Sequence, residues 1–509
     1  MPRLTLSMIV RNEEKYLKEC LESVKGIADE IVIIDTGSTD NTIKIAESYG
    51  ASIFNFEWIN DFSAARNFAL SKSNGTWILY LDADERLDPK SIPELKRIIS
   101  APTKTGYFCT IKSVDREESR DNAMLYVRLF ANSPEIRFAG KVHEQIVQSL
   151  TFNEYTLSKS TIVIHHVGYN VSVEDKQKKA ARNLPLLLDE YKNNKDAYYA
   201  FQLAQTYNVL NDDDNASVYF KAASESPKLD RQYRAQCYSS LALIAHKGFK
   251  TQEAEKLIVH SLKVDDKQPF SYLLASKISH RKNELNLAEE RCKRAYILNQ
   301  TLLVKGFDAV LSVLLDPEEV IYYGLILALQ NKNNQNYHFY QKELFALYKS
   351  LDEANATNNL DSLSKIFSNA PFSENEVSIV IKMINKNNLN FFLFMLGNNP
   401  YKQQVMQIIA KLRDIFPNAL EVRKSYARIL EELGKIEEAI EIMEGVAKEN
   451  QTDPAVFFYL ISYYLKFGKE DKIKQIVLQL EKHFSHIPDV MTRVRTLKRK
   501  LLMLTSVPL

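Results

Sequence analysis

Two aspartates separated by one residue are the first candidates for chemistry in this sequence. Asp82 and Asp84 come directly after the apolar run Trp77–Leu81. If the chain turns there, both carboxylates reach the same side, and carboxylate oxygens are the ligands that Mg²⁺ and Mn²⁺ prefer. The alternative is a solvated acidic turn. We expect a site at which Mg²⁺ or Mn²⁺ bridges these carboxylates to substrate phosphates.

A histidine and a glutamate stand next to each other further along the chain. His143-Glu144 is not an HExxH zinc motif, because position 147 holds valine. Imidazole can supply a third metal ligand, and the adjacent carboxylate can remove a proton from an acceptor hydroxyl or thiol. We therefore predict His143 as a metal ligand and Glu144 as the catalytic base. A buried structural histidine beside a surface glutamate is the alternative.

Two further charged residues occupy positions at which a nucleotide can be held. Asp35 ends the apolar segment that begins at Glu30, and a carboxylate at such a strand end commonly accepts hydrogen bonds from nucleotide hydroxyls. Arg66 lies in the first turns of a helix that Asp61 or Ser63 can cap. We expect its guanidinium to point at an anion or a base, although an ordinary surface arginine is the alternative.

The segment after the first apolar run lacks two common nucleotide-binding motifs. Arg11–Glu14 stands where a dinucleotide-binding fold has its GxGxxG turn, which argues against NAD or FAD. The sequence also has no GxxxxGK[ST] phosphate loop. We therefore expect no glycine-rich cradle for phosphates.

The elements that must position these residues follow from the apolar pattern. The short apolar runs are continuous rather than alternating, which is typical of a parallel sheet covered on both faces. We predict strands at Leu4–Val10, Glu30–Asp35, Ala51–Phe56 and Trp77–Asp82, with amphipathic helices near Glu14–Val24, Asn41–Tyr49 and Phe62–Ser73. In such an α/β domain the ligand crevice lies beyond the carboxyl ends of the strands, where the candidate residues fall.

From about Asp175 onward the pattern changes to pairs of helices with an internal repeat. Small or apolar residues recur at a spacing of 34 positions. Ala427, Gly434, Ala439, Met443 and Val446 are followed 34 positions later by Ile461, Gly468, Ile473, Val477 and Leu480. This period, with small residues where helices approach, is typical of tetratricopeptide repeats. We therefore expect an all-α repeat domain after the α/β domain.

Charge and cysteine content exclude several classes of protein. Lys and Arg total 66 against 64 Asp and Glu, so the net charge of +2 does not favour nucleic acid or an anionic membrane as a partner. The four cysteines are too far apart for a CxxC metal site and too few for a disulfide framework. No apolar stretch approaches the roughly 18 residues of a transmembrane segment. We expect a soluble, cytoplasmic protein.

The set of motifs resembles the family 2 glycosyltransferases of the GT-A fold. The resemblance covers about the first 170 residues and is carried by Leu6–Glu13, Glu30–Asp40, Asp61–Asn67, Asp82–Asp84 and Gly140–Glu144. With the helical repeats and His166–Asn170, the sequence is similar to the branch that includes the peptide S-glycosyltransferases of glycocin bacteriocins. Residues 1–90 also resemble lipopolysaccharide core glucosyltransferases.

The resemblance implies an inverting, metal-dependent hexosyltransferase that uses a nucleotide-diphosphate sugar, with a UDP-sugar as the expected donor. It places Asn12 and Glu13 at the edge of the nucleotide pocket, Asp35 at the base or ribose, Arg66 on the nucleotide, and the DxD aspartates Asp82 and Asp84 on the metal and diphosphate. Many members carry their base in a Glu-Asp pair far beyond the DxD motif. That pair is missing before the repeats, so Glu144 is the best candidate, followed by Asp115, Glu117 and Glu118.

These expectations divide the chain into four parts and leave the acceptor open. Residues 1–175 form the GT-A domain, 176–300 tetratricopeptide-like repeats, 301–400 an irregular helical segment, and 401–509 the C-terminal repeats. We expect the repeats to hold a peptide or protein acceptor on a concave surface. The alternative role of the C-terminal repeats is to form a homodimer through Gly434–Phe484. Transfer to a lipid-linked or cell-envelope glycan, or a non-catalytic repeat scaffold, are the alternative functions.

Overall fold

The computed structural model describes residues 3–100, 103–115, 120–167, 173–305, 311–351, 353–449 and 453–505. The chain packs into two compact units. Unit 1 comprises Met1–Ile244, Lys256–Leu274 and Ile297–Asp316, and unit 2 comprises Ala245–Glu255, Ala275–Tyr296 and Pro317–Leu509. Unit 1 is therefore built from three separate stretches of sequence.

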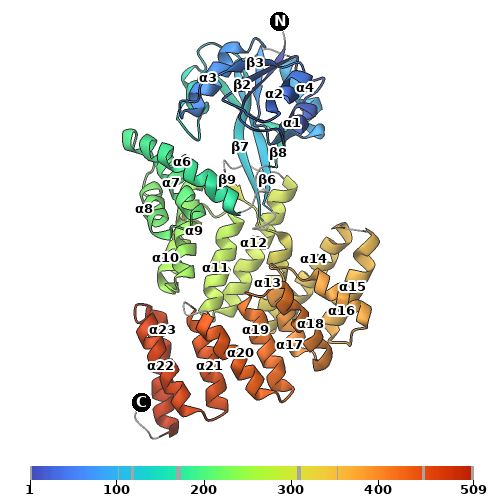
Figure 1. The fold of residues 1–509 in the computed structure, drawn as a ribbon, viewed down its shortest axis with the longest axis vertical. Coiled ribbons are helices and arrows are strands. Elements are labelled where there is room, and N and C mark those ends of the chain that lie inside the picture. Colours follow the sequence, from blue (N-terminus) through green and yellow to red (C-terminus); the bar gives the residue numbers. More distant parts are fainter. Residues whose placement is uncertain are drawn as a thin grey trace. The chain divides into compact units, whose positions relative to one another are not determined.

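A single mixed sheet forms the centre of the N-terminal domain in unit 1 (Figure 1). Its parallel part has the order β3-β2-β1-β4, with β1 at Leu4–Val10, β2 at Glu30–Asp35, β3 at Ser52–Asn55 and β4 at Trp77–Tyr80. Beyond β4 the sheet continues through β7 (Arg120–Ala131), β6 (Thr105–Asp115), β8 (Thr156–His166) and β5 (Glu85–Leu87). The predicted α/β class is confirmed.

β1, β2 and β4 are largely buried on both faces, as their continuous apolar sequences require, whereas β3 at the edge of the sheet is partly exposed. Leu4, Leu6 and Met8 of β1 pack in one core with α1 (Leu17–Ser23), α2 (Thr42–Ser48) and α4 (Ile92–Ile99). On the other face, Ile78 and Tyr80 of β4 pack with α3 (Phe62–Lys72) and α5 (Val147–Phe152). The side chains of the two faces alternate along each strand, because successive residues of a strand point to opposite sides.

The strand register aligns the carboxyl ends of the parallel strands. Val10 at the end of β1 pairs with Asp35 at the end of β2, and Ser7 pairs with Tyr80 at the end of β4. The β1–α1 turn and the residues after Tyr80 therefore emerge at the same edge of the sheet, where a ligand crevice is expected.

Unit 1 also includes helices that follow the sheet and one late strand. After β8 come α6 (Val173–Asn193), α7 (Ala197–Val209), α8 (Asp213–Ser224) and α9 (Arg231–Lys247). A short strand, β9 (Leu311–Val313), pairs with β7 more than 180 residues after β7 begins. The segment 301–400, expected to be helical, therefore also supplies a strand of the sheet.

The remaining described residues are helical, in agreement with the all-α prediction. The helices are α10 (Thr251–Val264), α11 (Pro269–Arg281), α12 (Leu285–Lys305), α13 (Pro317–Gln330), α14 (Asn334–Leu351), α15 (Glu353–Ser368), α16 (Glu374–Met383), α17 (Leu389–Asn398), α18 (Lys402–Ile415), α19 (Leu420–Glu432), α20 (Ile436–Glu449), α21 (Pro454–Lys466), α22 (Glu470–Phe484) and α23 (Pro488–Thr505). None of the described helices is both long and apolar enough to cross a membrane.

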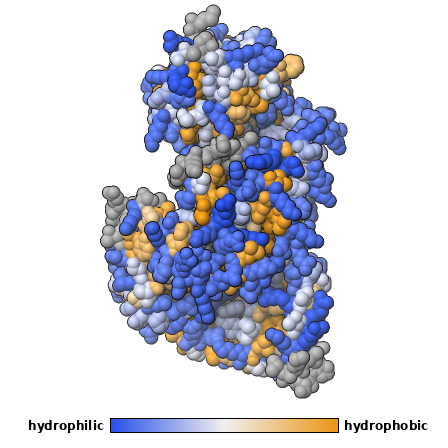
Figure 2. Space-filling view, turned by 180° about the vertical axis from the view of Figure 1, so that it is seen from behind, coloured by the Kyte–Doolittle hydropathy of each residue, from blue (hydrophilic) through white to orange (hydrophobic). Residues whose placement is uncertain are grey.

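The predicted 34-residue repeat falls on equivalent positions of successive helix pairs. Gly434 follows α19 and Gly468 follows α21, and both have positive φ, at 80° and 65°, where glycine is favoured. Ala439 in α20 and Ile473 in α22 are buried in the same core. The molecular face in Figure 2 is mostly hydrophilic, with its apolar residues in separate groups.

Candidate active site

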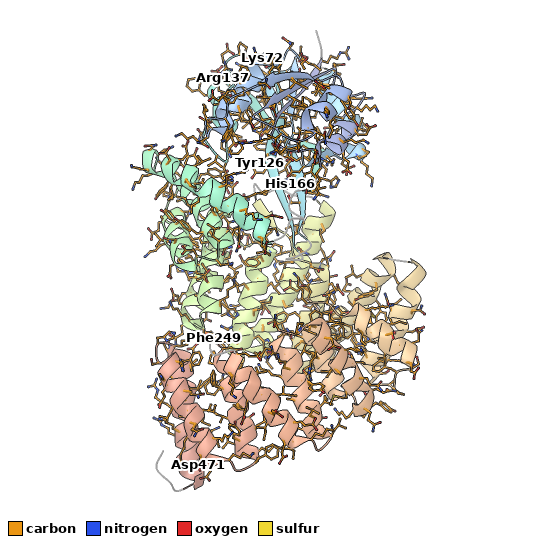
Figure 3. The ribbon with its side chains drawn as sticks, viewed as in Figure 1. Lys72, Tyr126, Arg137, His166, Phe249 and Asp471 are labelled. Carbon is orange, nitrogen blue, oxygen red and sulfur yellow. The ribbon has the colours of Figure 1, made fainter. Side chains whose placement is uncertain are left out.

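A cavity of about 440 Å³ lies at the edge of the sheet where β1 and β4 end. Its walls come from the β1–α1 turn, α3, the residues after β4, strands β6 and β7, the segment 142–145, and helices α6 and α7. Six predicted site residues line it together: Glu13, Arg66, Asp82, Asp84, His143 and Glu144. Tyr126 and His166, which also line the cavity, lie near each other at this end of the sheet (Figure 3).

Asp82 is held by two buried arginines. Arg66 Nη2 donates to Asp82 Oδ1 at 2.7 Å, and Arg128 Nη2 donates to Oδ2 at 3.4 Å. Both guanidinium groups lie over the ring of Tyr80, with their central carbons 5.1 and 4.4 Å from its centroid. Burial raises the pKa of Asp82, but the two arginines outweigh it and hold the pKa well below its usual value. Asp82 is therefore a firmly oriented carboxylate.

Glu85 and Arg128 form the buried base of this network, and the sequence motifs assigned neither of them a role. Arg128 Nη2 donates to Glu85 Oε1 at 2.6 Å, and the other carboxylate oxygen accepts the backbone N–H of Asp82 at 2.9 Å. Glu85 is 1% exposed, and burial raises its pKa despite Arg128. Two features of the sequence could have pointed to these residues. Glu85 directly follows the DxD motif, and Arg128 is a charged residue inside an apolar strand.

Asp84 pairs with a histidine other than the predicted one. Asp84 Oδ2 lies 3.1 Å from Nε2 of His166, at the end of β8, and Nδ1 of that ring lies 3.3 Å from the hydroxyl of Ser113. Burial lowers the pKa of His166, but its bond to Asp84 more than compensates, so the pKa is raised. In the sequence, His166 is singled out only as the first residue of the segment His166–Asn170; the structure places it on the second aspartate of the DxD motif.

His143 and Glu144 lie on a loop tied to α3. Asn67 in α3 bonds through its side chain to both backbone groups of Phe138, at 2.8 and 2.9 Å. His143 has a φ of 52°, a left-handed conformation that is uncommon for residues other than glycine and often found at functional sites. Burial lowers the pKa of His143, so its imidazole is neutral near pH 7 and able to accept a proton or bind a metal.

Glu144 is paired with Arg66 inside the cavity. Its Oε1 accepts from Arg66 Nε, and the two side chains are 14% and 8% exposed. Arg66 thus connects the candidate base to the DxD motif, because its other end binds Asp82. The role of Glu144 as a base stays a prediction.

Glu13 is the residue of the β1–α1 turn whose acidity is most altered. Burial and the nearby charge of Asp84 raise its pKa from 4.5 to about 7. Its backbone N–H donates to Thr42 Oγ1 at 2.7 Å, which fixes the turn against α2. A cation bound near Asp84 would favour the ionised form of Glu13.

Asn12 and Asp35 are not among the residues that line the cavity, and their polar atoms hold the adjoining turn. Asn12 Oδ1 accepts the backbone N–H of Thr39 at 2.8 Å. The Asp35 carboxylate accepts the backbone N–H groups of Gly37 and Ser38 at 3.2 and 3.1 Å. Their predicted contacts with a nucleotide stay predictions. Glu117, Glu118 and Gly168–Asn170 lie outside the described residues.

The donor groups around Asp84 suit a metal that binds together with a diphosphate. Within the described parts of the chain, no three His, Cys, Asp or Glu side chains gather closely enough to hold a metal alone. Asp84 and His166 offer one carboxylate and one imidazole, and Mg²⁺ commonly takes one or two carboxylates together with phosphate oxygens and water. A metal bond to Asp82 would require one of its arginines to move.

Comparison with known proteins assigns the N-terminal part to a family. Residues 5–160 match the family model described as Glycosyl transferase family 2. A TPR repeat-containing protein of Synechococcus elongatus is 40% identical over 178 residues, which cover 33% of this chain and 43% of that protein. The SPbeta prophage-derived glycosyltransferase SunS of Bacillus subtilis is 29% identical over 236 residues, 45% of this chain and 54% of that protein. The resemblance predicted from the motifs is confirmed: the chain carries a family 2 glycosyltransferase domain.

Other similarities are more limited. The lipopolysaccharide core biosynthesis glycosyltransferase LpsC of Rhizobium meliloti is 36% identical over 165 residues, 29% of this chain and 58% of that protein. Among solved structures, S. aureus TarS matches with a TM-score of 0.28 and 15% identity, over 53% of this chain and 54% of that one. The chain spans about half the length of the curated relatives it matches.

Proposed function

We propose that the protein is an inverting, metal-dependent glycosyltransferase that moves a sugar from a nucleotide-diphosphate sugar, expected to be a UDP-sugar, to a peptide or protein side chain. The observation that carries the proposal is the common cavity of the Asp84–His166 pair and Glu144 at the carboxyl edge of the sheet. The residues proposed to hold the metal and diphosphate, and the candidate base, therefore line the same cavity.

Each charged group has a distinct part in this reaction. Asp84 and His166 would hold Mg²⁺ or Mn²⁺, which supplies positive charge to the diphosphate oxygens. Asp82, fixed by Arg66 and Arg128, keeps the turn that presents Asp84 in place. Glu144 accepts the proton of the acceptor hydroxyl or thiol through Oε2, because Arg66 engages only Oε1.

The transfer is a single displacement. As Glu144 takes the proton, the acceptor atom forms a bond to C1 of the sugar, and the bond from C1 to the diphosphate oxygen breaks with its electron pair remaining on the diphosphate. The products are the glycosylated acceptor, a nucleoside diphosphate and a protonated Glu144. Attack from the side opposite the leaving group inverts the configuration at C1.

Donor hydrolysis with and without Mn²⁺ tests the donor half of the proposal. Wild-type protein should release nucleoside diphosphate from one member of a panel of nucleotide sugars, and Asp84→Asn should lower that rate by roughly 10²-fold or more, because an amide is a poor ligand for a hard cation. Asp88→Asn is the matched control: Asp88 also pairs with a histidine, His165, at 2.9 Å, but is not among the residues lining the cavity. Equal losses in both variants would count against the metal assignment.

The base assignment needs a separate variant and an acceptor. Glu144→Gln should retain donor affinity yet lose about 10²–10⁴-fold in transfer, the usual range for a positioned base. Proteins that co-purify with the enzyme serve as acceptors. Their intact mass is measured before and after the donor is added. Wild-type transfer rates in Glu144→Gln would move the search for the base to Asp115, Glu117 and Glu118.

A cell-envelope glycan is the second candidate acceptor, favoured by the similarity to LpsC of Rhizobium meliloti. In that case a sugar hydroxyl takes the place of the peptide side chain, and the donor chemistry is unchanged. Transfer to oligosaccharide acceptors with no mass change on any co-purified protein would favour this candidate.

A further inference from the structure

Two cationic side chains of helix α6 line the candidate active site although α6 lies outside the family match. Lys179 and Arg182 are part of the cavity wall, together with Asn183. The family match ends at residue 160, and α6 begins at Val173. The helical part of the chain therefore contributes charge to the same cavity as the DxD motif.

Helix α6 is fixed to the loop that carries the candidate base. The backbone N–H of Lys141 donates to Glu190 Oε1 at 2.8 Å, and the Lys141 ammonium lies 2.6 Å from Asp189 Oδ2. Both acidic residues belong to α6. These bonds hold the helix beside segment 142–145, so its cations are presented to the cavity by a defined contact.

The arginine of α6 has contacts that orient it without neutralising it. The Arg182 guanidinium lies 5.8 Å from the ring centroid of Phe62, at the start of α3, and its Nε donates to Asn183 Oδ1 at 3.1 Å. Burial lowers the pKa of Arg182, although the nearby Glu13 opposes this. An arginine stays protonated under these conditions, so it offers a positive charge to a ligand.

The two deeper arginines of the cavity are already neutralised. Arg66 is paired with Asp82 and Glu144, and Arg128 with Glu85. By contrast, no carboxylate of the described residues lies within ion-pair distance of Lys179 or Arg182. Unlike Arg66 and Arg128, Lys179 and Arg182 can therefore accept an anion from solution without first losing an internal partner.

Both cations act on the end of the cavity that holds the DxD motif. Glu13 is influenced by the charges of both Asp84 and Lys179, and Arg182 in turn by Glu13 and Arg11. Asp84, Lys179 and Arg182 line the same cavity, so a ligand bound to Asp84 through a metal shares that space with both cations.

We propose that Lys179 and Arg182 bind the diphosphate of the donor and stabilise the nucleoside diphosphate as the leaving group; this rests on the proposed function. When the bond from C1 to the diphosphate oxygen breaks, the diphosphate gains one unit of negative charge. Cations already in place lower the energy of that charge in the transition state, and an arginine can engage two phosphate oxygens at once. The helical part thereby completes the donor site.

The test compares binding of UDP and of uridine to the full-length protein by calorimetry in the presence of Mn²⁺. Lys179→Ala and Arg182→Ala should each weaken UDP binding by about five- to tenfold, in the lower range for charge-assisted hydrogen bonds at an exposed rim, and should leave uridine binding unchanged. Lys178→Ala is the matched control, because Lys178 lies on the same helix, is 74% exposed and is not among the residues lining the cavity. Arg182→Lys should recover part of the affinity.

The outcomes separate this inference from the proposed function. If wild type binds UDP, and Lys179→Ala and Arg182→Ala bind it as tightly as Lys178→Ala does, the diphosphate role of α6 is wrong while the donor assignment stands. Equal loss of UDP and uridine affinity would also overturn the inference, because it indicates a disturbed fold. If wild type binds none of UDP, GDP, ADP, CDP and dTDP, both the proposed function and this inference fall.

Discussion

The buried ion pair between Arg128 and Glu85 offers the sharpest test of how this site is held together. The two side chains are 9% and 2% exposed and their closest atoms are 2.6 Å apart. Removing one partner of a buried pair typically costs about 3–5 kcal/mol, because the other charge remains buried without compensation. Arg128 also lies over Tyr80 and contacts Asp82. We therefore expect Arg128→Met to lower the free energy of unfolding of unit 1 by about 4 kcal/mol.

A double-mutant cycle separates the ion pair from the other contacts of Arg128. Glu85→Gln should cost less, about 1–2 kcal/mol, because the amide oxygen can still accept the backbone N–H of Asp82. The double variant should be more stable than the sum of the single losses implies, by about 2 kcal/mol, since neither charge is then left unpaired.

Urea unfolding followed by tryptophan fluorescence is the appropriate assay. The chain has two tryptophans, Trp58 and Trp77, and both lie in unit 1, so the signal reports that unit. A coupling energy below about 0.5 kcal/mol, the usual limit for independent sites, would refute the reasoning. So would an Arg128→Met variant as stable as wild type.

Two further predictions concern pH and packing. Burial and Asp84 raise the pKa of Glu13 from 4.5 to about 7, so its contribution to folding is complete below pH 4.5 and is lost as the pH rises towards 7. Relative to Glu13→Gln, wild type should therefore lose roughly 1–3 kcal/mol of unfolding free energy over that range in urea titrations, and a difference between the two that does not change with pH would contradict this. In unit 2, a Cβ at Gly324 would overlap the buried ring of Tyr340, so Gly324→Ala should lower the free energy of unfolding of that unit by about 1–3 kcal/mol, measured by circular dichroism. Gly445→Ala, with nothing within 4 Å, should instead be neutral or stabilising by up to about 1 kcal/mol; the reverse order would contradict the packing.

Local sequence determined the elements that carry the site. The runs Leu4–Val10 and Glu30–Asp35 became β1 and β2 with the predicted bounds, because strands buried on both faces need continuous apolar residues. Of the two cap candidates Asp61 and Ser63, Asp61 caps α3, its Oδ1 accepting the backbone N–H of Ala64 at 2.9 Å. Strand ends and helix caps depend on a few neighbouring residues, so they can be recognised without knowing the rest of the chain.

Only the tertiary structure decided which charges meet. Asp84 pairs with His166, 82 positions further on, and Arg128 with Glu85 across β5 and β7, and no spacing in the sequence indicates either pair. Likewise Lys179 and Arg182 read as ordinary charges on an amphipathic helix until α6 is placed beside the cavity. Burial and ion-pair energies depend on distance in space and on exclusion of water, and both are settled only when sheet, loop and helix pack together.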